Sequence, residues 1–367
     1  MNNKRINIIF SVILVITVCA TSFFFIRSHN KKVALTAGNQ AEETETFRPD
    51  GIYSESGSFV FYKDGKKSTE TGFIYGEING EKANYYCKNG VIDFTYNALI
   101  KKENNIWWYV KNGKVYEETD KTILIKLNEN FSAGFNEDKF SFYGGYVLSD
   151  ESEKIIKDTI EAVEKKGYDV GICVYDLNTL GGFSYKADDK IYSASAIKGP
   201  YVVSLVDYDN SLLQKEKVRI NAILRNSSNI DYESLRLQYG DNVICNWSVN
   251  SKNFINKDRD YQYLTPRQLS ELWLSNYVFF ESSDIGEETG KLFENPAHSP
   301  INTVFKDNCI TRTKAGWVEK NNIRVTNDAG IIYVNDNAYL VTIMTTAPCN
   351  FKVVENLASA VKEIIIK

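Results

Sequence analysis

The first hydrophobic feature of the chain is an uncharged run of 21 residues at positions 6–26, "INIIFSVILVITVCATSFFFI". About 20 apolar residues in a helix cross the hydrocarbon core of a bilayer. The run continues past "VCA", the place for a signal-peptide cut, which favours a retained anchor. Basic residues flank both ends, so the charges leave the orientation open. We expect a membrane anchor over 1–32, a polar linker over 33–50, and the rest of the chain outside the cytoplasm.

Short aromatic runs follow the linker. Three stretches, "FVFYKDGKK", "NYYCKNGVI" and "WWYVKNGKV", each place aromatic residues before a Lys-Asp-Gly or Lys-Asn-Gly turn. The turn glycines Gly65, Gly90 and Gly113 are 25 and 23 residues apart. Asp-Gly and Asn-Gly favour the tight turns that join two antiparallel strands. The spacing therefore predicts a small all-β module of stacked hairpins over 51–145.

This module resembles the aromatic-rich repeats of cell-wall-binding modules on Gram-positive surface proteins. The resemblance implies that the repeats bind a wall polysaccharide or teichoic acid. A spacer that holds the next domain away from the membrane explains the same pattern, and both hypotheses stay open. Trp107 and Trp108 are the best candidates for ligand contact, because adjacent strand residues point to opposite faces.

The pattern changes at about residue 146. It indicates, in order, an amphipathic helix, two short strands, a mixed helical block, three strands with Asn-rich turns, and a final amphipathic helix. Helices at both ends of such a segment pack together on one face of an antiparallel sheet. The pattern thus predicts an α+β domain over 146–367, with an antiparallel sheet, flanking helices and a small helical block.

Composition argues against several classes of function. The net charge is −4 over 367 residues, which gives no support to a nucleic-acid partner. The chain has two histidines, and only His298 could serve as the base of a Ser-His-Asp triad. The six cysteines are scattered without a C-x-x-C pair, so we expect neither a metal nor another cofactor. Buried free thiols and a single disulfide both fit these cysteines.

One candidate nucleophile stands out in "YSASAIKGPYVV". Ser195 precedes Lys198 by three residues at a predicted strand-to-helix junction. Residues i and i+3 share a helix face, and burial lowers the pKa of a lysine so that it can take the proton of a serine. The S-x-x-K pattern also occurs at Ser28 and Ser359, so it is weak alone. An N-cap serine followed by a surface lysine is the alternative.

Two distant motifs strengthen the first one. "RNSSNIDYESL" contains Ser227 and Asn229 in an S-x-N pattern, and "TRTKAGW" contains Lys314 and Gly316 in a K-x-G pattern. S-x-x-K, S-x-N and K-x-G in this order resemble the signature of penicillin-interacting serine enzymes, the class A β-lactamases and the related D,D-peptidases. The resemblance covers 146–367 and implies a β-lactamase/transpeptidase-like fold.

The resemblance implies a role for each motif residue. Ser195 attacks an amide carbonyl, and Lys198 takes its proton. Ser227 passes a proton to the leaving nitrogen. Asn229 holds the amide of the substrate, and Lys314 supplies positive charge for its carboxylate. No cofactor takes part.

Three further residues complete the implied site. Gly316 closes the K-x-G motif. The backbone N–H of Trp317, with that of Ser195, forms the oxyanion hole. Arg324, ten residues after Lys314, adds a second positive charge for the substrate carboxylate.

The omega loop of the family is matched only in part. "NKDRDY" resembles the Arg-Asp pair that closes this loop, here Arg259 and Asp260, and "LTPRQLSELW" is similar to the helix start that follows it. The stretch before Arg259, "CNWSVNSKNFINKD", lacks the glutamate with which class A β-lactamases activate the deacylating water. The sequence therefore predicts slow release of an acyl group.

Two other departures concern the substrate. Ala315 stands where the family has Thr or Ser, which removes one hydrogen bond to the substrate carboxylate. Only 32 residues separate Ser195 from Ser227, so the helical block is shorter than in class A enzymes.

Together these motifs predict a membrane-anchored serine hydrolase at a Gram-positive-like cell surface. It would act on a β-lactam or a peptidoglycan peptide through an acyl-Ser195 intermediate. The alternative is a catalytically weak or inactive penicillin-binding or wall-binding protein that keeps the fold for recognition. An esterase that uses the same Ser-Lys pair is a third hypothesis.

Overall fold

Residues 48–102, 107–118, 140–143, 146–335 and 337–366 are described by the structure, which is a computed structural model. The predicted anchor over 1–32 and most of the linker lie outside these ranges, so both stay predictions. No helix within the described ranges has the length and apolar character needed to cross a bilayer.

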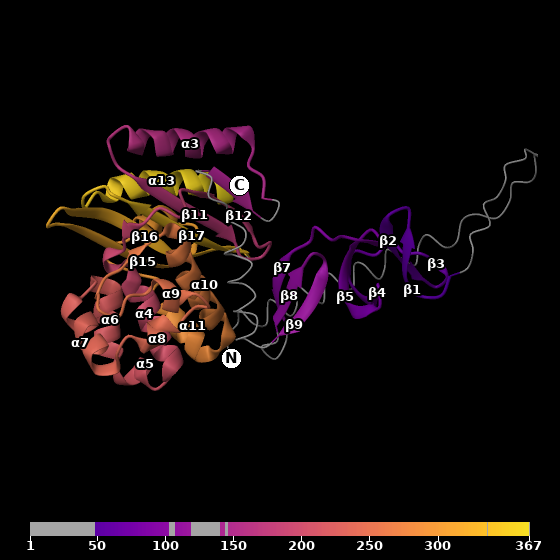
Figure 1. Ribbon diagram of the computed structural model, residues 1–367, viewed down its shortest axis with the longest axis horizontal. Helices are drawn as coiled ribbons and strands as arrows, with labels where there is room; N and C mark the ends of the chain where they lie inside the picture. The colour runs from indigo at the N-terminus through magenta and orange to yellow at the C-terminus, as the bar shows by residue number, and fades with distance from the viewer. Residues whose placement is uncertain (1–47, 103–106, 119–139, 144–145, 336, 367) are drawn as a thin grey trace, which may run out of the picture. The chain divides into compact units, whose positions relative to one another are not determined.

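The first sheet contains the predicted hairpins (Figure 1, indigo to magenta). Within the described residues it has nine antiparallel strands, with the order β1-β2-β6-β5-β9-β8-β7, while β3 pairs with β2 and β4 with β5. The strands are β1 (Gly51–Glu55), β2 (Ser58–Lys63), β3 (Lys66–Lys67), β4 (Gly72–Ile78), β5 (Glu81–Lys88), β6 (Val91–Ile92), β7 (Ala98–Lys101), β8 (Trp107–Lys111) and β9 (Lys114–Glu118).

The three predicted hairpin turns are confirmed. They connect β2 to β3, β5 to β6 and β8 to β9. At each turn an Asp or Asn and the following Gly both adopt positive φ, as a tight primed turn requires. The φ angles are 53° and 77° at Asp64 and Gly65, 52° and 76° at Asn89 and Gly90, and 51° and 70° at Asn112 and Gly113.

The turn glycines also bring successive hairpins into contact. A Cβ atom on Gly90 would lie 1.8 Å from the carbonyl oxygen of Ser68, and one on Gly113 would lie 2.4 Å from that of Asp93. Both serine and aspartate follow the preceding hairpin directly. Only glycine allows this approach, so the turn of each later hairpin rests on the exit of the hairpin before it.

The tryptophans of this module pack inside it. Trp107 is 2% exposed, so the prediction that it contacts a ligand is wrong. Trp108 is half-buried, and its ring meets Phe73 edge to face at 5.3 Å. The exposed aromatic side chains of the module include Tyr75 and Phe94 instead.

The second sheet is antiparallel, with the order β10-β12-β11-β17-β16-β15 among the described residues. Its strands are β10 (Phe140–Tyr143), β11 (Val170–Asp176), β12 (Gly181–Tyr185), β15 (Ile310–Lys320), β16 (Ile323–Val334) and β17 (Asn337–Thr345). Because β10 pairs with β12, this sheet begins before the predicted domain boundary at 146. The sequence of residues 140–143, "FSFY", did not indicate pairing with β12, which lies far along the chain.

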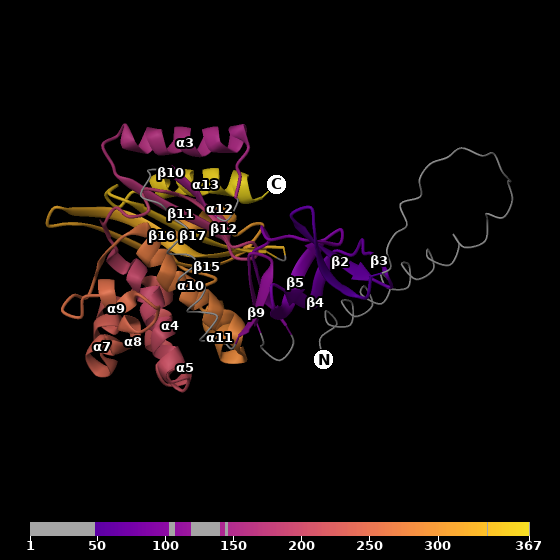
Figure 2. The ribbon, with the colours of Figure 1, turned by 45° about the vertical axis from the view of Figure 1, so that its right-hand side comes forward.

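Helices cover both faces of the second sheet (Figures 1 and 2). One face carries α3 (Asp150–Glu164), α12 (Pro300–Phe305) and α13 (Phe351–Ile365). There Ile160 and Val361 share a buried cluster with Val174 of the sheet. The predicted packing of the two terminal helices on one face is therefore confirmed.

The other face carries α10 and the helical block. α10 (Pro266–Ser282) begins at the predicted Thr-Pro sequence, where Thr265 and Gln268 form a capping box. Trp273 of this helix is buried with Tyr201 and Met344. The remaining elements of the block are β13 (Ile191–Tyr192), the 3₁₀ turn η2 (Ala194–Ile197), α4 (Lys198–Tyr208), α5 (Leu212–Lys215), α6 (Lys217–Asn226), α7 (Asn229–Tyr239), α8 (Asn242–Cys245), α9 (Ser251–Phe254), β14 (Tyr263–Leu264) and α11 (Asp284–Lys291).

Candidate active site

Ser195 lies at the predicted strand-to-helix junction, in the 3₁₀ turn η2 between β13 and α4. Residues three apart are eclipsed in a 3₁₀ turn, so Ser195 and Lys198 share one face. Ala194 has a φ of 44°, which is strained for a residue with a side chain. The junction thus holds a half-buried serine on a sharply turned backbone.

The strand β15 lies directly behind this turn. A Cβ atom on Gly316 would lie 2.6 Å from the backbone nitrogen of Ser195 and 2.3 Å from that of Ala196. Only glycine fits there, so the K-x-G motif is explained by a close backbone approach. The ring of Trp317 packs against Phe351 at 5.1 Å, which leaves its backbone as the part available to the site. Its role in an oxyanion hole stays a prediction.

Lys198 is buried, and three oxygen atoms surround its ammonium group. Nζ donates to the carbonyl oxygens of Ser227 (2.8 Å) and Ser228 (3.2 Å) and to Asn229 Oδ1 (2.5 Å). Burial lowers the pKa of Lys198 to about 8, whereas the charge of Glu233 acts to raise it. A neutral form is therefore accessible near neutral pH, as a general base requires.

The resting contacts of Lys198 do not include the nucleophile. The side chain of Ser195 makes no hydrogen bond to a described residue, and Lys198 gives all three of its N–H groups to other acceptors. Proton transfer from Ser195 thus requires Lys198 to lose one proton and to turn away from one acceptor.

Ser227 connects the two predicted lysines. It ends α6 in the left-handed region, with a φ of 58°, and strained backbone of this kind is frequent at functional sites. Its carbonyl oxygen accepts from Lys198, and its hydroxyl accepts from Lys314 Nζ over 3.0 Å. The structure thus brings the S-x-N and K-x-G motifs into direct contact.

Lys314 is almost fully buried on β15. Burial is the main cause that lowers its pKa to about 7, and the charge of Lys198 adds to the effect, whereas Asp328 opposes it. Two buried lysines thus lie around one serine, and each can carry a positive charge near neutral pH. An anionic group of a substrate would be stabilised there.

Asp328 lies on the neighbouring strand, opposite Ala315. Its Oδ2 accepts from the Ser299 hydroxyl (2.5 Å) and the Ile301 N–H (2.9 Å). Burial raises the pKa of Asp328 to about 7. Oδ1 is buried without a hydrogen-bond partner among the described residues, and Ala315 offers it no hydroxyl.

Arg324 does not belong to the site. It pairs with Glu319 across the β15–β16 hairpin. Glu319 lies five residues after Lys314 on β15, and hence about 17 Å farther along the strand. The Arg324 guanidinium lies 3.8 Å from the Glu319 carboxylate and is largely exposed. The prediction of a second cation for the substrate is wrong, because spacing in sequence did not reveal how far the hairpin extends.

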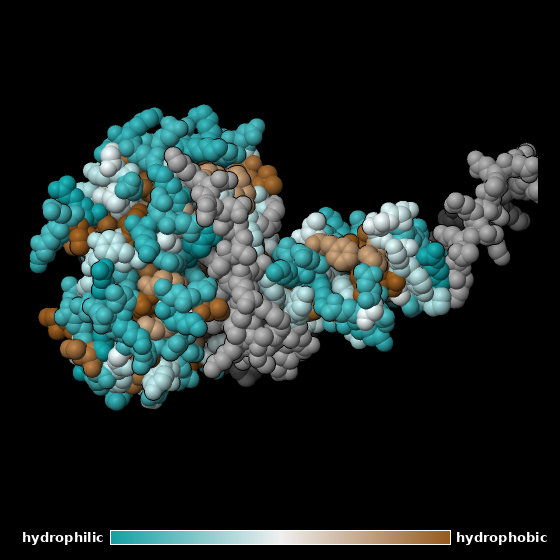
Figure 3. All heavy atoms as spheres, in the orientation of Figure 1, coloured by the Kyte–Doolittle hydropathy of each residue, from teal (hydrophilic) through white to brown (hydrophobic). Residues whose placement is uncertain are grey.

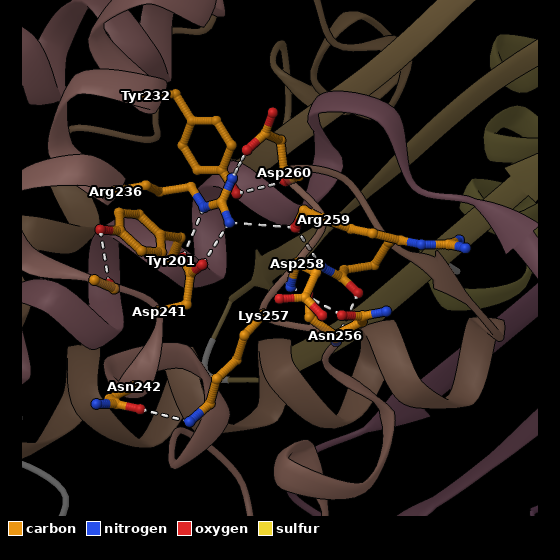
Figure 4. A network of polar contacts seen from close by, with 12 residues as sticks. Tyr201, Tyr232, Arg236, Asp241, Asn242, Asn256, Lys257, Asp258, Arg259 and Asp260 are labelled. Atoms are coloured by element: carbon orange, nitrogen blue, oxygen red, sulfur yellow. Dashed lines mark hydrogen bonds and ion pairs between the residues drawn. The ribbon is translucent and has the colours of Figure 1, made fainter.

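The omega loop is closed by an arginine that the sequence did not indicate (Figure 4). Arg236 of α7 donates to Asp241 from Nε (2.7 Å) and Nη2 (2.5 Å), and it also pairs with Asp260. Tyr232 donates to the carbonyl oxygen of Asp260 over 3.0 Å. Arg259 points away from Asp260, so the predicted Arg259–Asp260 pair is wrong. Charge pairing between α7 and a loop some twenty residues later has no local signal in the sequence.

The loop before Arg259 carries no glutamate, and slow release of an acyl group stays a prediction. The acidic residues of this loop are Asp258, which is exposed, and Asp260, which pairs with Arg236. No carboxylate of the described chain lies within ion-pair distance of Lys198. Tyr261 lies near Lys198 instead, 5.7 Å from its ammonium to the ring centre. The Tyr261 hydroxyl donates to Asn229 Oδ1 over 2.9 Å.

Comparison with solved structures finds likenesses that cover somewhat more than half of this chain. No protein-family model and no curated protein matches the sequence. The crystal structure of a class A β-lactamase from Clostridium kluyveri DSM 555 is 16% identical, with a TM-score of 0.46, and covers 56% of this chain and 97% of that chain.

Two further structures show the same likeness. TLA-3 extended-spectrum β-lactamase is 14% identical, with a TM-score of 0.49, over 59% of this chain and 100% of that one. PBP-A is 14% identical, with a TM-score of 0.46, over 57% of this chain and 95% of that one. Likenesses at such identities and TM-scores do not establish an activity, so the reaction has to be inferred from the site itself.

The site combines the groups that acyl transfer needs. It holds a serine nucleophile on a turned backbone, a buried lysine as base, a second serine between two lysines, and an exposed amide at Asn229. No cluster of metal-ligating side chains occurs in the described part of the chain. The arrangement fits attack on an amide carbonyl next to an anionic group.

Proposed function

We propose that this protein is a serine acyl-enzyme of the β-lactamase/D,D-peptidase type, acting on a β-lactam or on the amide of a wall peptide. One observation carries the proposal. Ser227 accepts hydrogen bonds from two buried lysines, Lys198 through its carbonyl and Lys314 through its hydroxyl. A mere helix cap at Ser195 would not account for two buried cations nearby, because burying a lysine without function is costly.

Acylation follows from these positions. The Ser195 oxygen forms a bond to the amide carbonyl carbon, and its proton passes to neutral Lys198. The carbon–nitrogen bond then breaks. The leaving nitrogen takes the proton of the Ser227 hydroxyl, which is replaced by a proton from Lys314. With a pKa of about 8, Lys198 is neutral in about one molecule in ten at pH 7.

Release of the acyl group lacks an evident base. No carboxylate of the described residues lies beside Lys198, and Tyr261 stands on that side of the lysine. We therefore propose a long-lived acyl-enzyme, and so a penicillin-binding protein rather than a fast β-lactamase. An inactive binding protein and an esterase remain the competing functions.

The test is acylation of the full-length chain by a fluorescent penicillin, followed by intact mass. We expect one covalent adduct that persists for many minutes and is absent in Ser195→Ala. Nitrocefin should be hydrolysed slowly. Absence of an adduct with penicillins, cephalosporins and ester probes would favour the inactive binding protein. Reaction with esters alone would favour the esterase, and fast nitrocefin turnover would contradict the long-lived intermediate.

We also propose that the chain is anchored in the membrane of a Gram-positive-like cell and that the nine-stranded module binds wall polysaccharide. The observation that favours binding is an open hollow lined by Tyr53, Tyr75, Glu77 and Lys82, which combines aromatic faces with polar groups. A band of apolar residues on this module is visible in Figure 3. Stacking of sugar rings on aromatic side chains would use Tyr75, which is 66% exposed.

Sedimentation with Gram-positive sacculi tests this second proposal. The full-length chain should sediment with the sacculi, and Tyr75→Ala should weaken sedimentation severalfold. Val147→Ala, at a site outside the module that is 84% exposed, serves as the control. Equal sedimentation of all three proteins, or none, would favour the spacer.

A further inference from the structure

Tyr261 lies beside the proposed base, although it belongs to none of the three motifs. Its hydroxyl donates to Asn229 Oδ1 over 2.9 Å. Lys198 donates to the same oxygen over 2.5 Å, and its ammonium lies 5.7 Å from the centre of the Tyr261 ring. A phenol and an ammonium thus share one acceptor in the centre of the site.

The two donors define how the Asn229 amide is turned. An ammonium group can only donate hydrogen bonds. The Asn229 atom nearest Lys198 must therefore be oxygen, and the Tyr261 hydroxyl must donate to it as well. The Nδ2 group then points away from both donors, and Asn229 is an exposed residue. Its two N–H groups are left to face a substrate.

Tyr261 is well placed for this role because its backbone is braced. The next residue, Gln262, donates its N–H to the Ser193 hydroxyl (3.1 Å) and accepts from the Ser193 N–H (2.7 Å). The Gln262 side chain also donates to the carbonyl oxygens of Asn256 (2.9 Å) and Arg259 (2.8 Å). The loop end that carries Tyr261 is therefore tied to the turn that carries Ser195.

Aromatic neighbours hold the ring itself. The Tyr261 ring lies 5.8 Å from that of Tyr232 and 6.2 Å from that of Tyr192. Lys198 Nζ lies 5.4 Å from the Tyr232 ring, so its charge is near two aromatic faces. Loss of the hydroxyl alone would leave this packing in place.

We propose that Tyr261 is a positioning residue of the acylation site: its hydroxyl holds the Asn229 amide with the NH₂ group toward the substrate and competes with Lys198 for Asn229 Oδ1. The proposal rests on the proposed function of the same site. It also gives Tyr261 an influence on the proton of Lys198.

The consequence for Lys198 has a definite sign. Two donors that share one oxygen weaken each other. Without the Tyr261 hydroxyl, Asn229 Oδ1 accepts more strongly from Lys198 and stabilises its ammonium form. The neutral base then appears at higher pH. A purely structural role of Tyr261 predicts no such change.

The test compares Tyr261→Phe with Tyr263→Phe. Tyr263 is on the same segment and packs on Tyr192 at 5.2 Å, but makes no contact with Asn229. Acylation by benzylpenicillin is measured against concentration and pH. In Tyr261→Phe the apparent dissociation constant should rise by about three- to tenfold, with a smaller change in the limiting rate. The midpoint of the pH profile should move to higher pH. Tyr263→Phe should match the wild type in both.

A second measurement does not depend on any substrate. The titration of Lys198 is followed by NMR in the free full-length proteins with ¹³C-labelled lysine. We expect a higher midpoint in Tyr261→Phe than in the wild type and Tyr263→Phe. An unchanged midpoint would overturn the proposal, whether or not penicillin reacts. Failure of the wild type to react with any acylating probe, with the shifted midpoint present, would instead overturn the proposed function.

Discussion

At the scale of single residues, the site is dominated by the competition between burial and charge. Lys198 and Lys314 are both buried, and burial is the first cause of the lowered pKa of each. The charge of Lys198 lowers the pKa of Lys314 further, whereas the charge of Glu233 partly offsets the lowering of the pKa of Lys198. The result is one lysine that can act as a base and one that is poised to give up a proton near pH 7.

Glu233→Gln tests this balance at a distance from the reacting atoms. The Glu233 carboxylate raises the pKa of Lys198, so its removal should lower that pKa. Acylation needs neutral Lys198, and its rate should therefore rise at lower pH in the variant. Because Glu233 is exposed, solvent screening limits the shift to about a few tenths of a pH unit.

The measurement is the pH profile of acylation by a fluorescent penicillin. Glu233→Asp keeps the charge and should behave like the wild type. A shift of the Glu233→Gln profile to higher pH would show that Lys198 does not act as the base in its neutral form.

At the scale of elements, the S-x-N motif and the omega loop are joined by one side chain. Arg236 projects from α7, the helix that begins with Asn229, and pairs with Asp241 and Asp260 on either side of the loop. Asp260 directly precedes Tyr261. The same arginine thus sets the distance between the amide of Asn229 and the hydroxyl that holds it.

Arg236→Ala should therefore destabilise the protein more than Arg259→Ala. The Arg236 side chain is 9% exposed between two carboxylates, and removing it leaves Asp241 half-buried without its partner. We expect a loss of about 2–4 kcal/mol. The guanidinium of exposed Arg259 lies over the Tyr263 ring, 5.9 Å from its centre. Its removal should cost less than about 0.5 kcal/mol. Urea unfolding measures both, and equal losses would contradict the assignment.

The elements show which local patterns were sufficient. Hairpin turns at Gly65, Gly90 and Gly113 could be predicted because left-handed backbone needs particular residue types. The start of α10 at Thr265 could be predicted from its cap and proline. The edge strand β10 could not be predicted, because its pairing with β12 depends on residues about 40 positions away, which no local pattern encodes.

At the scale of the whole molecule, the buried lysines oppose stability while they serve chemistry. The pKa of Lys314 is about 7 in the fold and near 10.5 in an unfolded chain. Between pH 7 and pH 10.5 the unfolded chain binds more protons at Lys314 than the folded protein does. A rise in pH through this range therefore stabilises the fold. Sites of this kind commonly trade stability for activity.

Lys314→Met should reveal this cost. The variant should lose acylation, yet it should be more stable than the wild type near pH 7. The difference in free energy of unfolding between the variant and the wild type should shrink from pH 7 to pH 10 by about 1.4 kcal/mol per pH unit. Urea unfolding at several pH values checks this expectation. An advantage that does not change between pH 7 and pH 10 would show that Lys314 stays protonated in the fold, with a pKa that is not lowered. A less stable variant would show that packing of the Lys314 alkyl chain dominates.

The sequence alone determined the residue types, their order along the chain and the local backbone that they favour. These were enough for the hairpin turns, the α+β pattern and the five motif residues Ser195, Lys198, Ser227, Asn229 and Lys314, because turn chemistry, helix periodicity and motif spacing are local properties. Tertiary structure alone decided which charges and hydroxyl groups meet. It excluded Arg324, exchanged Arg259 for Arg236 and brought Tyr261 to Asn229. Distances between side chains depend on strand register and on loop paths, and both are set by the packing of the whole chain.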